Sequence, residues 1–192
     1  MLRAVLAIAL LVSSLHAGAG DFPRPASLEP AVQFWIRVYT EITTNQGYIH
    51  DAVDMSVIYE TVDLPTYASN RKRDQLVKEA KDRVARALTS IAGGKRSKLN
   101  DAEARVLAAW PEGTSASAFN LAADNVRFQL GQANRFKEGM VRSGQWRPHI
   151  REVLAAHKLP PELEVLPHVE SSFNPSVYSK VPDSAAGVRP RR

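Results

Sequence analysis

The sequence predicts a mainly α-helical protein, and three observations lead to this fold class. Apolar residues recur at helical spacing over residues 69–92 and again over 162–173. Asn100 is followed three residues later by Glu103, a capping-box pattern that marks the start of a helix. Only residues 55–62 combine alternation with the β-branched and aromatic content that favours a short strand.

The composition bounds the classes of function. The 192 residues are 44% hydrophobic and 23% charged, as in a globular protein with one sizeable core or two small ones. The net charge of +5 is too small for a dedicated nucleic-acid binder, so we expect no nucleic-acid partner. The absence of cysteine excludes disulfides, thiol catalysis, cysteine-ligated zinc and a lipid anchor on cysteine. Any association with a membrane would therefore be peripheral.

The first nineteen residues resemble a secretory signal peptide. Arg3 supplies the positive charge, residues 4–15 form an apolar run, and the small residues 17–19 form a cleavage site. The apolar run is shorter than the ~20 residues that span a bilayer. We therefore expect secretion to the periplasm rather than a membrane anchor.

Four helices are predicted in the region that follows, which we delimit as 20–144, and the first two are these. After an extended, proline-rich lead-in, a helix over 29–45 is expected to end at Gly47 and to turn inward Val32, Trp35, Ile36, Tyr39 and Ile42. A helix over 69–92 stops at two glycines. Its exposed face places acids four residues before bases, which predicts the ion pairs Asp74–Lys78, Glu79–Arg83 and Asp82–Arg86.

Two more helices are expected before a boundary near Gln145. The capping box opens a helix that Pro111 closes. Residues 115–141 read as one long helix, with Gly131 as a weak point and with an inward stripe of Phe119, Ala122, Val126, Leu130, Ala133 and Phe136.

Past the boundary, the sequence becomes richer in proline and aromatic residues. A short helix that carries Ile150 and Leu154 breaks at Pro160, and Pro161 is well placed to start another. That helix is expected to continue to Phe173 with a kink at Pro167.

Glu170 lies at the border of this last apolar stripe and is the best candidate for acid/base chemistry. A carboxyl group held against apolar side chains, here Val169 and Phe173, keeps its proton more readily and can donate it. Ser171 and Asn174 offer hydrogen bonds that could orient it. On spacing alone, an ordinary surface glutamate remains the simpler interpretation.

Other functional patterns are incomplete. His168 and Glu170 match half of a zinc-deaminase motif, but the other half requires cysteine. Lys95 follows a glycine as in a phosphate-binding loop, yet the Ser or Thr that should come next is absent. His149 and His157 have no carboxylate ligand in register. We expect neither a metal nor a cofactor.

Residues 159–175, which read LPPELEVLPHVESSFNP, and residues 177–180, which read VYSK, resemble the opening of the soluble lytic transglycosylase domain, of the lysozyme-like superfamily. In that family a run of the type Leu-Pro-x-Val-Glu-Ser-x-Phe contains the catalytic glutamate, and Glu170 followed by Ser171 matches it. Residues 126–132 (VRFQLGQ) and 140–144 (MVRSG) are similar to the helical region before this domain in membrane-bound lytic murein transglycosylases of the D type.

The resemblance implies cleavage of the β-1,4 linkage between N-acetylmuramic acid and N-acetylglucosamine in peptidoglycan strands. Glu170 would act as the single acid/base and leave a 1,6-anhydromuramyl product. The substrate's acetamido group can stabilise the intermediate, so a second protein carboxylate is not needed. Ser171 and Asn174 would orient Glu170 or bind substrate.

The resemblance also predicts an incomplete domain. We expect a signal peptide at 1–19, the helical region at 20–144, the opening helices of a lysozyme-like transglycosylase domain at 145–181 and a divergent tail at 182–192. The family continues with a Gly-Ala-x-Gly-Leu-Trp-Gln-Phe run and further helices that complete the cleft, whereas residues 189–192 read RPRR. A frameshift or early stop would explain this. The alternative is a non-catalytic periplasmic helical module that binds glycan, or a decayed product.

Overall fold

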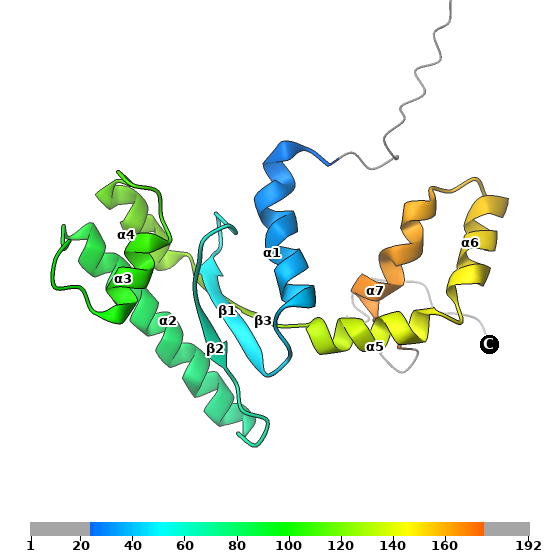
Figure 1. Cartoon of the computed structure of the whole chain (residues 1–192), viewed down its shortest axis with the longest axis horizontal. Helices are drawn as coiled ribbons and strands as arrows, with labels where there is room; N and C mark the ends of the chain where they lie inside the picture. The colour runs from blue at the N-terminus through cyan, green and yellow to red at the C-terminus, as the bar shows by residue number, and fades with distance from the viewer. Residues whose placement is uncertain (1–23, 175–192) are drawn as a thin grey trace, which may run out of the picture.

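The computed structural model describes residues 24–174, and it confirms a mainly α-helical fold. Within that range there are seven α-helices and one three-stranded sheet (Figure 1). The expected signal peptide and the expected divergent tail lie outside the described residues.

The first helix, α1 (Glu29–Thr40), follows a short turn, η1 (Ala26–Leu28), and carries Pro30 in its first turn. Phe34 and Val38 form its buried face, whereas Trp35 and Ile36 are 37% and 45% exposed. The prediction that Trp35 and Ile36 face inward is therefore wrong. The helix carries apolar residues on two of its faces, and the face with Phe34 packs against the sheet. The helix also ends at Thr40, before the predicted Asn45, because the chain turns there into the sheet.

The sheet has the strand order β2-β1-β3, and both pairings are antiparallel. Its strands are β1 (Gln46–Asp51), β2 (Ile58–Asp63) and β3 (Val126–Leu130). Gly47, which was expected to end a helix, pairs in β1 with Val62 and Leu130. Tyr48 packs with α1 on one face, while Ile49 joins the larger core on the other. Only β2 lies near the predicted strand at 55–62.

The larger core lies between the sheet and α2 (Asn70–Ala92), α3 (Asp101–Ala108) and α4 (Ala116–Asp124). Ser69 caps α2 by accepting the backbone N–H of Lys72. The predicted capping box at the start of α3 is confirmed, since Asn100 and Glu103 each accept the other's backbone N–H.

The ion pairs predicted along α2 are wrong, and several of the side chains expected in them have other partners. Lys78 pairs with Asp82 at 2.6 Å. Arg83 reaches across to Glu60 of β2 at 2.5 Å, a contact between two elements that spacing within one helix cannot foresee. The structure thus uses this face partly to hold α2 on the sheet.

The long helix predicted over 115–141 is wrong: the chain forms α4, then β3, then α5 (Ala133–Ser143). Val126 and Leu130 are four residues apart and therefore fit a helical stripe. Val126, Phe128 and Leu130 also alternate with polar residues, as in a strand, and the free edge of β1 can pair with them. Gly131 separates strand from helix. A Cβ atom there would lie 2.4 Å from the carbonyl oxygen of Ile42, so no larger residue fits.

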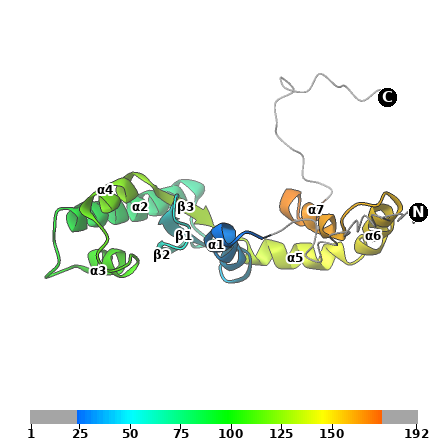
Figure 2. The same ribbon diagram turned by 90° about the horizontal axis from the view of Figure 1, so that it is seen from above.

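The last elements are α6 (Arg147–Ala156), the 3-10 turn η2 (Pro161–Val165) and α7 (Leu166–Glu170). The start at Pro161 is confirmed, but the single helix expected to reach Phe173 is wrong. Helix α7 ends at Glu170, and Ser172 and Phe173 take positive φ angles of 49° and 56° in the turn that follows. Seen from above, α2 to α4 form one end of the molecule, the sheet and α1 the middle, and α5 to α7 the other end (Figure 2).

Candidate functional site

The three residues singled out in the sequence lie around one concave surface. Glu170 is exposed at the end of α7, while Ser171 and Asn174 are partly buried. Together with residues of α5 they line a groove of about 490 Å³, which we call the Glu170 groove. The facing side chains from α5 and the residue before it are Gln132, Arg135, Glu138 and Arg142.

The turn after α7 is fixed on α5 by close packing. Gly139 is buried where the two segments meet, and a Cβ atom on it would lie 3.1 Å from the Cβ of Ser172. The guanidinium of Arg142 donates a hydrogen bond of 3.0 Å to the carbonyl oxygen of Ser172. Phe173 is 8% exposed. These contacts set the position of Glu170, which lies two residues before Ser172.

The polar neighbours of Glu170 are engaged with the backbone. The Ser171 hydroxyl donates to the carbonyl oxygen of Pro167 at 3.4 Å, and the backbone N–H of Asn174 donates to the carbonyl oxygen of Ser171 at 2.9 Å. These bonds define the turn. A role for Ser171 or Asn174 in orienting the carboxyl group stays a prediction.

The apolar shield expected for Glu170 is not formed by the described residues. Val169 is 68% exposed, and Phe173 packs beneath the turn against His168, with ring centroids 4.6 Å apart. Both side chains are apolar, but ending α7 at Glu170 turns Phe173 away from the position that a continued helix would give it. The carboxyl group therefore faces an open, polar groove.

Glu164 of η2 is a second carboxylate in this part of the chain, and its environment differs from that of Glu170. It accepts hydrogen bonds from Arg151 and, at 2.8 Å, from Arg147. These two guanidinium groups hold the pKa of Glu164 at about 2. Glu164 is thus ionised near neutral pH and cannot serve there as a proton donor.

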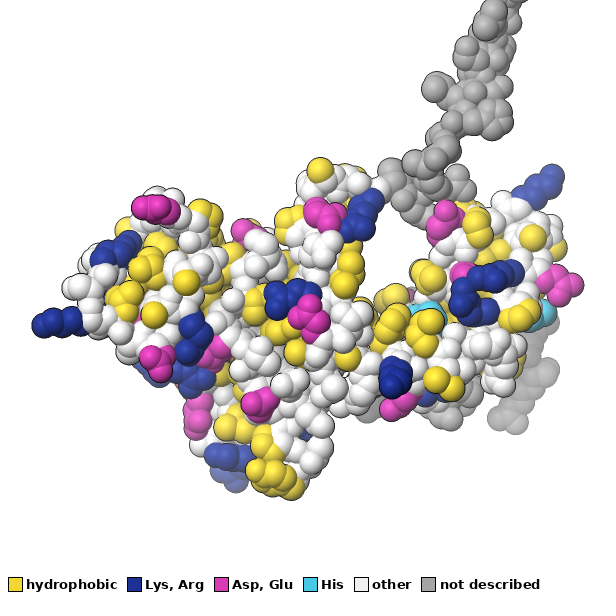
Figure 3. All heavy atoms as spheres, in the orientation of Figure 1, with side chains coloured by type: hydrophobic (Ala, Val, Ile, Leu, Met, Phe, Trp, Pro, Cys, Tyr) yellow, Lys and Arg dark blue, Asp and Glu magenta, His cyan; other side chains and the backbone are white. Residues whose placement is uncertain are grey.

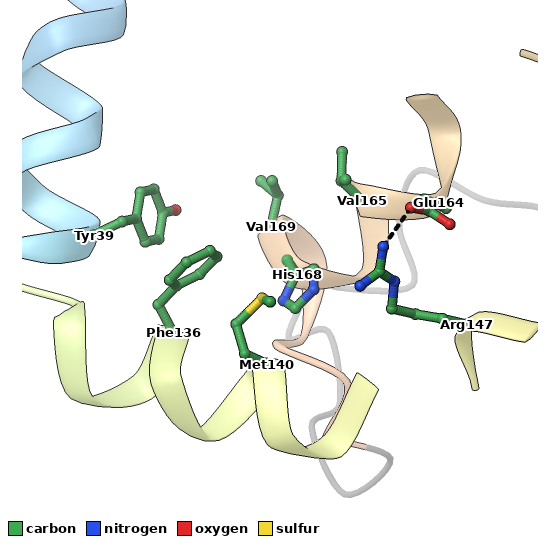
Figure 4. Close-up of a pocket in the computed structure, with 8 residues that line it drawn as sticks. All are labelled: Tyr39, Phe136, Met140, Arg147, Glu164, Val165, His168 and Val169. Carbon is green, nitrogen blue, oxygen red and sulfur yellow. Dashed lines mark hydrogen bonds and ion pairs between the residues drawn. The ribbon is translucent and has the colours of Figure 1, made fainter. Parts of the chain in front are cut away.

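A second concave surface, missed by the sequence reasoning, lies beside the first. Its volume is about 270 Å³, and we call it the aromatic hollow. Its lining comes from α1, α5, α6 and the η2–α7 segment and consists of Tyr39, Phe136, Met140, Arg147, Glu164, Val165, His168 and Val169 (Figure 4). Hydrophobic atoms and histidine are visible on the molecular surface in this region, next to Lys or Arg atoms (Figure 3). Tyr39 and Phe136 belonged to predicted apolar stripes, but the stripes could not show that they meet.

Within residues 24–174 no three His, Asp or Glu side chains are grouped so as to hold a metal ion. Over the same residues no helix has the length and apolar character needed to cross a bilayer. Comparison of the chain with known proteins finds no matching family model, no matching curated protein and no matching solved structure.

Proposed function

We propose that this chain carries the acid/base of a peptidoglycan lytic transglycosylase that acts in the periplasm, and that Glu170 is that residue. The observation that carries the proposal is the position of Glu170. The glutamate that the resemblance selects, at the end of α7, is exposed on a groove that a glycan strand could enter.

The chemistry requires one carboxyl group used twice. Protonated Glu170 gives its proton to the glycosidic oxygen, and the bond between C1 of N-acetylmuramic acid and that oxygen breaks. The resulting carboxylate then takes the proton of the C6 hydroxyl as its oxygen attacks C1. The 1,6-anhydro ring closes, Glu170 is protonated again, and no water is consumed.

The groove holds a second glutamate besides Glu170. Glu138 is the other glutamate there, and its carboxylate lies 3.6 Å from the Arg142 guanidinium with 63% of its side chain exposed. It remains the natural candidate for a second carboxylate, and an experiment can separate the two.

The test is the release of soluble fragments from purified sacculi, analysed by mass spectrometry. We expect 1,6-anhydro muropeptides from the unmodified chain and none from Glu170→Gln. Glu152→Gln, a change of the same kind at an exposed glutamate of α6, is the matched control and should release the unmodified amount. Glu138→Gln should retain most of the release. Its loss would indicate a mechanism with two carboxylates, and products heavier by one water would indicate hydrolysis.

A second candidate function is a glycan-binding module without activity. It is favoured by the exposure of Glu170, which lacks the apolar enclosure that a proton donor usually has. Such a module would sediment with sacculi and release nothing. Glu170→Gln would then sediment to the same extent as the unmodified chain.

A further inference from the structure

Five aromatic side chains form a continuous row across the middle of the molecule. Trp35 and Tyr39 of α1 have ring centroids 6.0 Å apart, and Tyr39 lies 5.5 Å from Phe136 of α5. Phe136 lies 5.4 Å from His168 of α7, which lies 4.6 Å from Phe173. The row joins the first helix to the turn that holds Glu170. Figure 4 shows its central members, Tyr39, Phe136 and His168, side by side.

The central part of this row lines the aromatic hollow and is open to solvent. Met140, Val165 and Val169, which also line the hollow, are 44%, 53% and 68% exposed. Apolar side chains grouped so openly around a concave surface are typical of a binding site. Val169 lines the Glu170 groove as well, so the two concave surfaces adjoin at α7.

One edge of the hollow is polar. Arg147 donates a hydrogen bond of 2.8 Å to Glu164, and the Arg147 and Glu164 side chains are 38% and 14% exposed. The buried Nδ1 atom of His168 has no hydrogen-bond partner among the described residues. Burial and the nearby Arg147 cation lower the pKa of His168, so the imidazole is neutral near pH 7. The hollow thus combines apolar walls with one polar edge, formed by Arg147 and Glu164, that can form hydrogen bonds.

This combination matches one class of ligand. A pyranose ring has apolar C–H faces that pack on aromatic rings and hydroxyl groups at its edge, and an N-acetyl substituent adds a methyl group and an amide. We propose that the aromatic hollow is a subsite for an N-acetylated pyranose of a glycan strand, next to the linkage that reaches Glu170; this assignment rests on the proposed function of that residue.

Two other classes of occupant fit less well. The two charged residues that line the hollow, Arg147 and Glu164, have opposite signs and are paired, so the lining offers an anionic ligand no unpaired cation. A wholly apolar partner helix would cover the Arg147–Glu164 ion pair without giving it hydrogen bonds, which is costly. A sugar can supply hydroxyl groups to this ion pair.

Binding of a tetramer of N-acetylglucosamine, measured by isothermal titration calorimetry on the full chain, tests the proposal. Tyr39→Leu removes one ring and keeps an apolar side chain. It should weaken binding by roughly threefold to tenfold, the range expected for one aromatic contact. The matched control is Tyr67→Leu, because Tyr67 is 91% exposed and does not line the hollow; it should bind as the unmodified chain does. Met140→Glu, which places a charge in the hollow, should also weaken binding.

The proposal is overturned if the unmodified chain does not bind the tetramer, or if Tyr39→Leu and Met140→Glu both bind it with unchanged affinity. A tetramer of glucose, which lacks the N-acetyl groups, should bind more weakly, and equal binding would contradict the assignment to N-acetylated sugars. Because the readout is binding, Glu170→Gln should bind normally while releasing nothing from sacculi. Failure of the subsite and failure of the acid/base assignment are therefore seen in different experiments.

Discussion

The imidazole of His168 lies edge-on against the ring of Phe173, with ring centroids 4.6 Å apart and ring planes at 70°. Phe173 has a positive φ of 56°, which an aromatic residue adopts only when its surroundings hold it there. The contact folds the chain after α7 back onto that helix. Glu170 lies between the two residues in sequence, so its place depends on this pair.

Replacing Phe173 by alanine should therefore loosen the end of α7. Loss of a buried aromatic ring is expected to cost about 3 kcal/mol of unfolding free energy, measured by chemical denaturation. Amide hydrogen exchange over residues 166–173 should become faster than elsewhere in the chain. Val169→Ala, at a position 68% exposed, is the control and should change stability by less than about 0.5 kcal/mol. Similar exchange in the two variants would show that the ring does not anchor the turn.

Gly131→Ala should be strongly destabilising, because the added Cβ would lie 2.4 Å from the backbone carbonyl oxygens of Ile42 and Thr43. Overpacking typically costs about 1–3 kcal/mol, and we expect about 3 kcal/mol here because the added atom meets backbone that cannot move aside. Gly144→Ala is the matched control, since its Cβ would meet only the carbonyl oxygen of Val141, at 3.5 Å, and its backbone is helical. The midpoint of thermal unfolding should fall sharply for the first and stay within a few degrees for the second. A stable Gly131→Ala protein would argue against this junction.

The capping box of α3 should be measurable by itself. Asn100→Ala removes the side chain that accepts the backbone N–H of Glu103 at 3.0 Å, and loss of such a cap costs about 1 kcal/mol. Ser97→Ala, at an exposed position just upstream, provides the comparison and should be close to neutral. The unfolding free energies of both variants are measured by chemical denaturation. If Asn100→Ala is as stable as Ser97→Ala, Glu103 is held mainly by its pairing with Lys95.

Acid should unfold the protein partly through Glu103 and Glu164. Hydrogen bonds from Lys95 to Glu103, and from Arg151 and Arg147 to Glu164, hold the pKa of each carboxylate at about 2 in the folded protein, against an ordinary value of 4.5. The unfolded chain binds more protons between these values, so the stabilisation is present above about pH 4.5 and is lost as the pH falls toward 2.

The Glu164→Gln variant isolates one of these contributions. Its unfolding free energy should be lower than that of the unmodified chain at pH 7, and the difference should shrink as the pH falls below 4.5. Denaturation curves at a series of pH values measure this. Glu162→Gln, an exposed change in the same turn, serves as control. A difference that stays constant with pH would show that the Arg147 and Arg151 contacts do not depend on the charge of Glu164.

The elements that the sequence predicted well are those specified by neighbouring residues. The capping box at Asn100 and the start at Pro161 were predicted, because each residue acts on backbone groups only a few positions away. The helix predicted from residue 69 is likewise capped locally, by Ser69. The strand β3 was missed for the opposite reason. Val126 and Leu130 fit a helix as well as a strand, and pairing with β1, about eighty residues upstream, decides between them.

The same distinction between local and distant contacts applies to the candidate site. The motif in the sequence selects Glu170, and its neighbours Ser171 and Asn174 must lie close to it. The groove itself depends on Arg135 and Arg142 of α5, and the sequence had placed Arg135 in a longer helix that ended before Arg142. The aromatic hollow depends on α1. Contacts between helices that are distant in the chain are not encoded in the spacing of either one.

The passage from β3 to α5 constrains how this protein can vary in length. Three consecutive backbone N–H groups, of Gly131, Gln132 and Ala133, donate hydrogen bonds to carbonyl oxygens upstream in the chain. The acceptors are Gln46 of β1, Val38 of α1 and Ile42 between them, so the start of α5 is bound directly to the sheet and to the α1 region. One inserted residue there would rotate α5 by about 100° and carry the Phe136 ring away from Tyr39. Natural relatives and engineered variants should therefore keep this junction at constant length, and accept insertions far more readily in the exposed loop at 111–114.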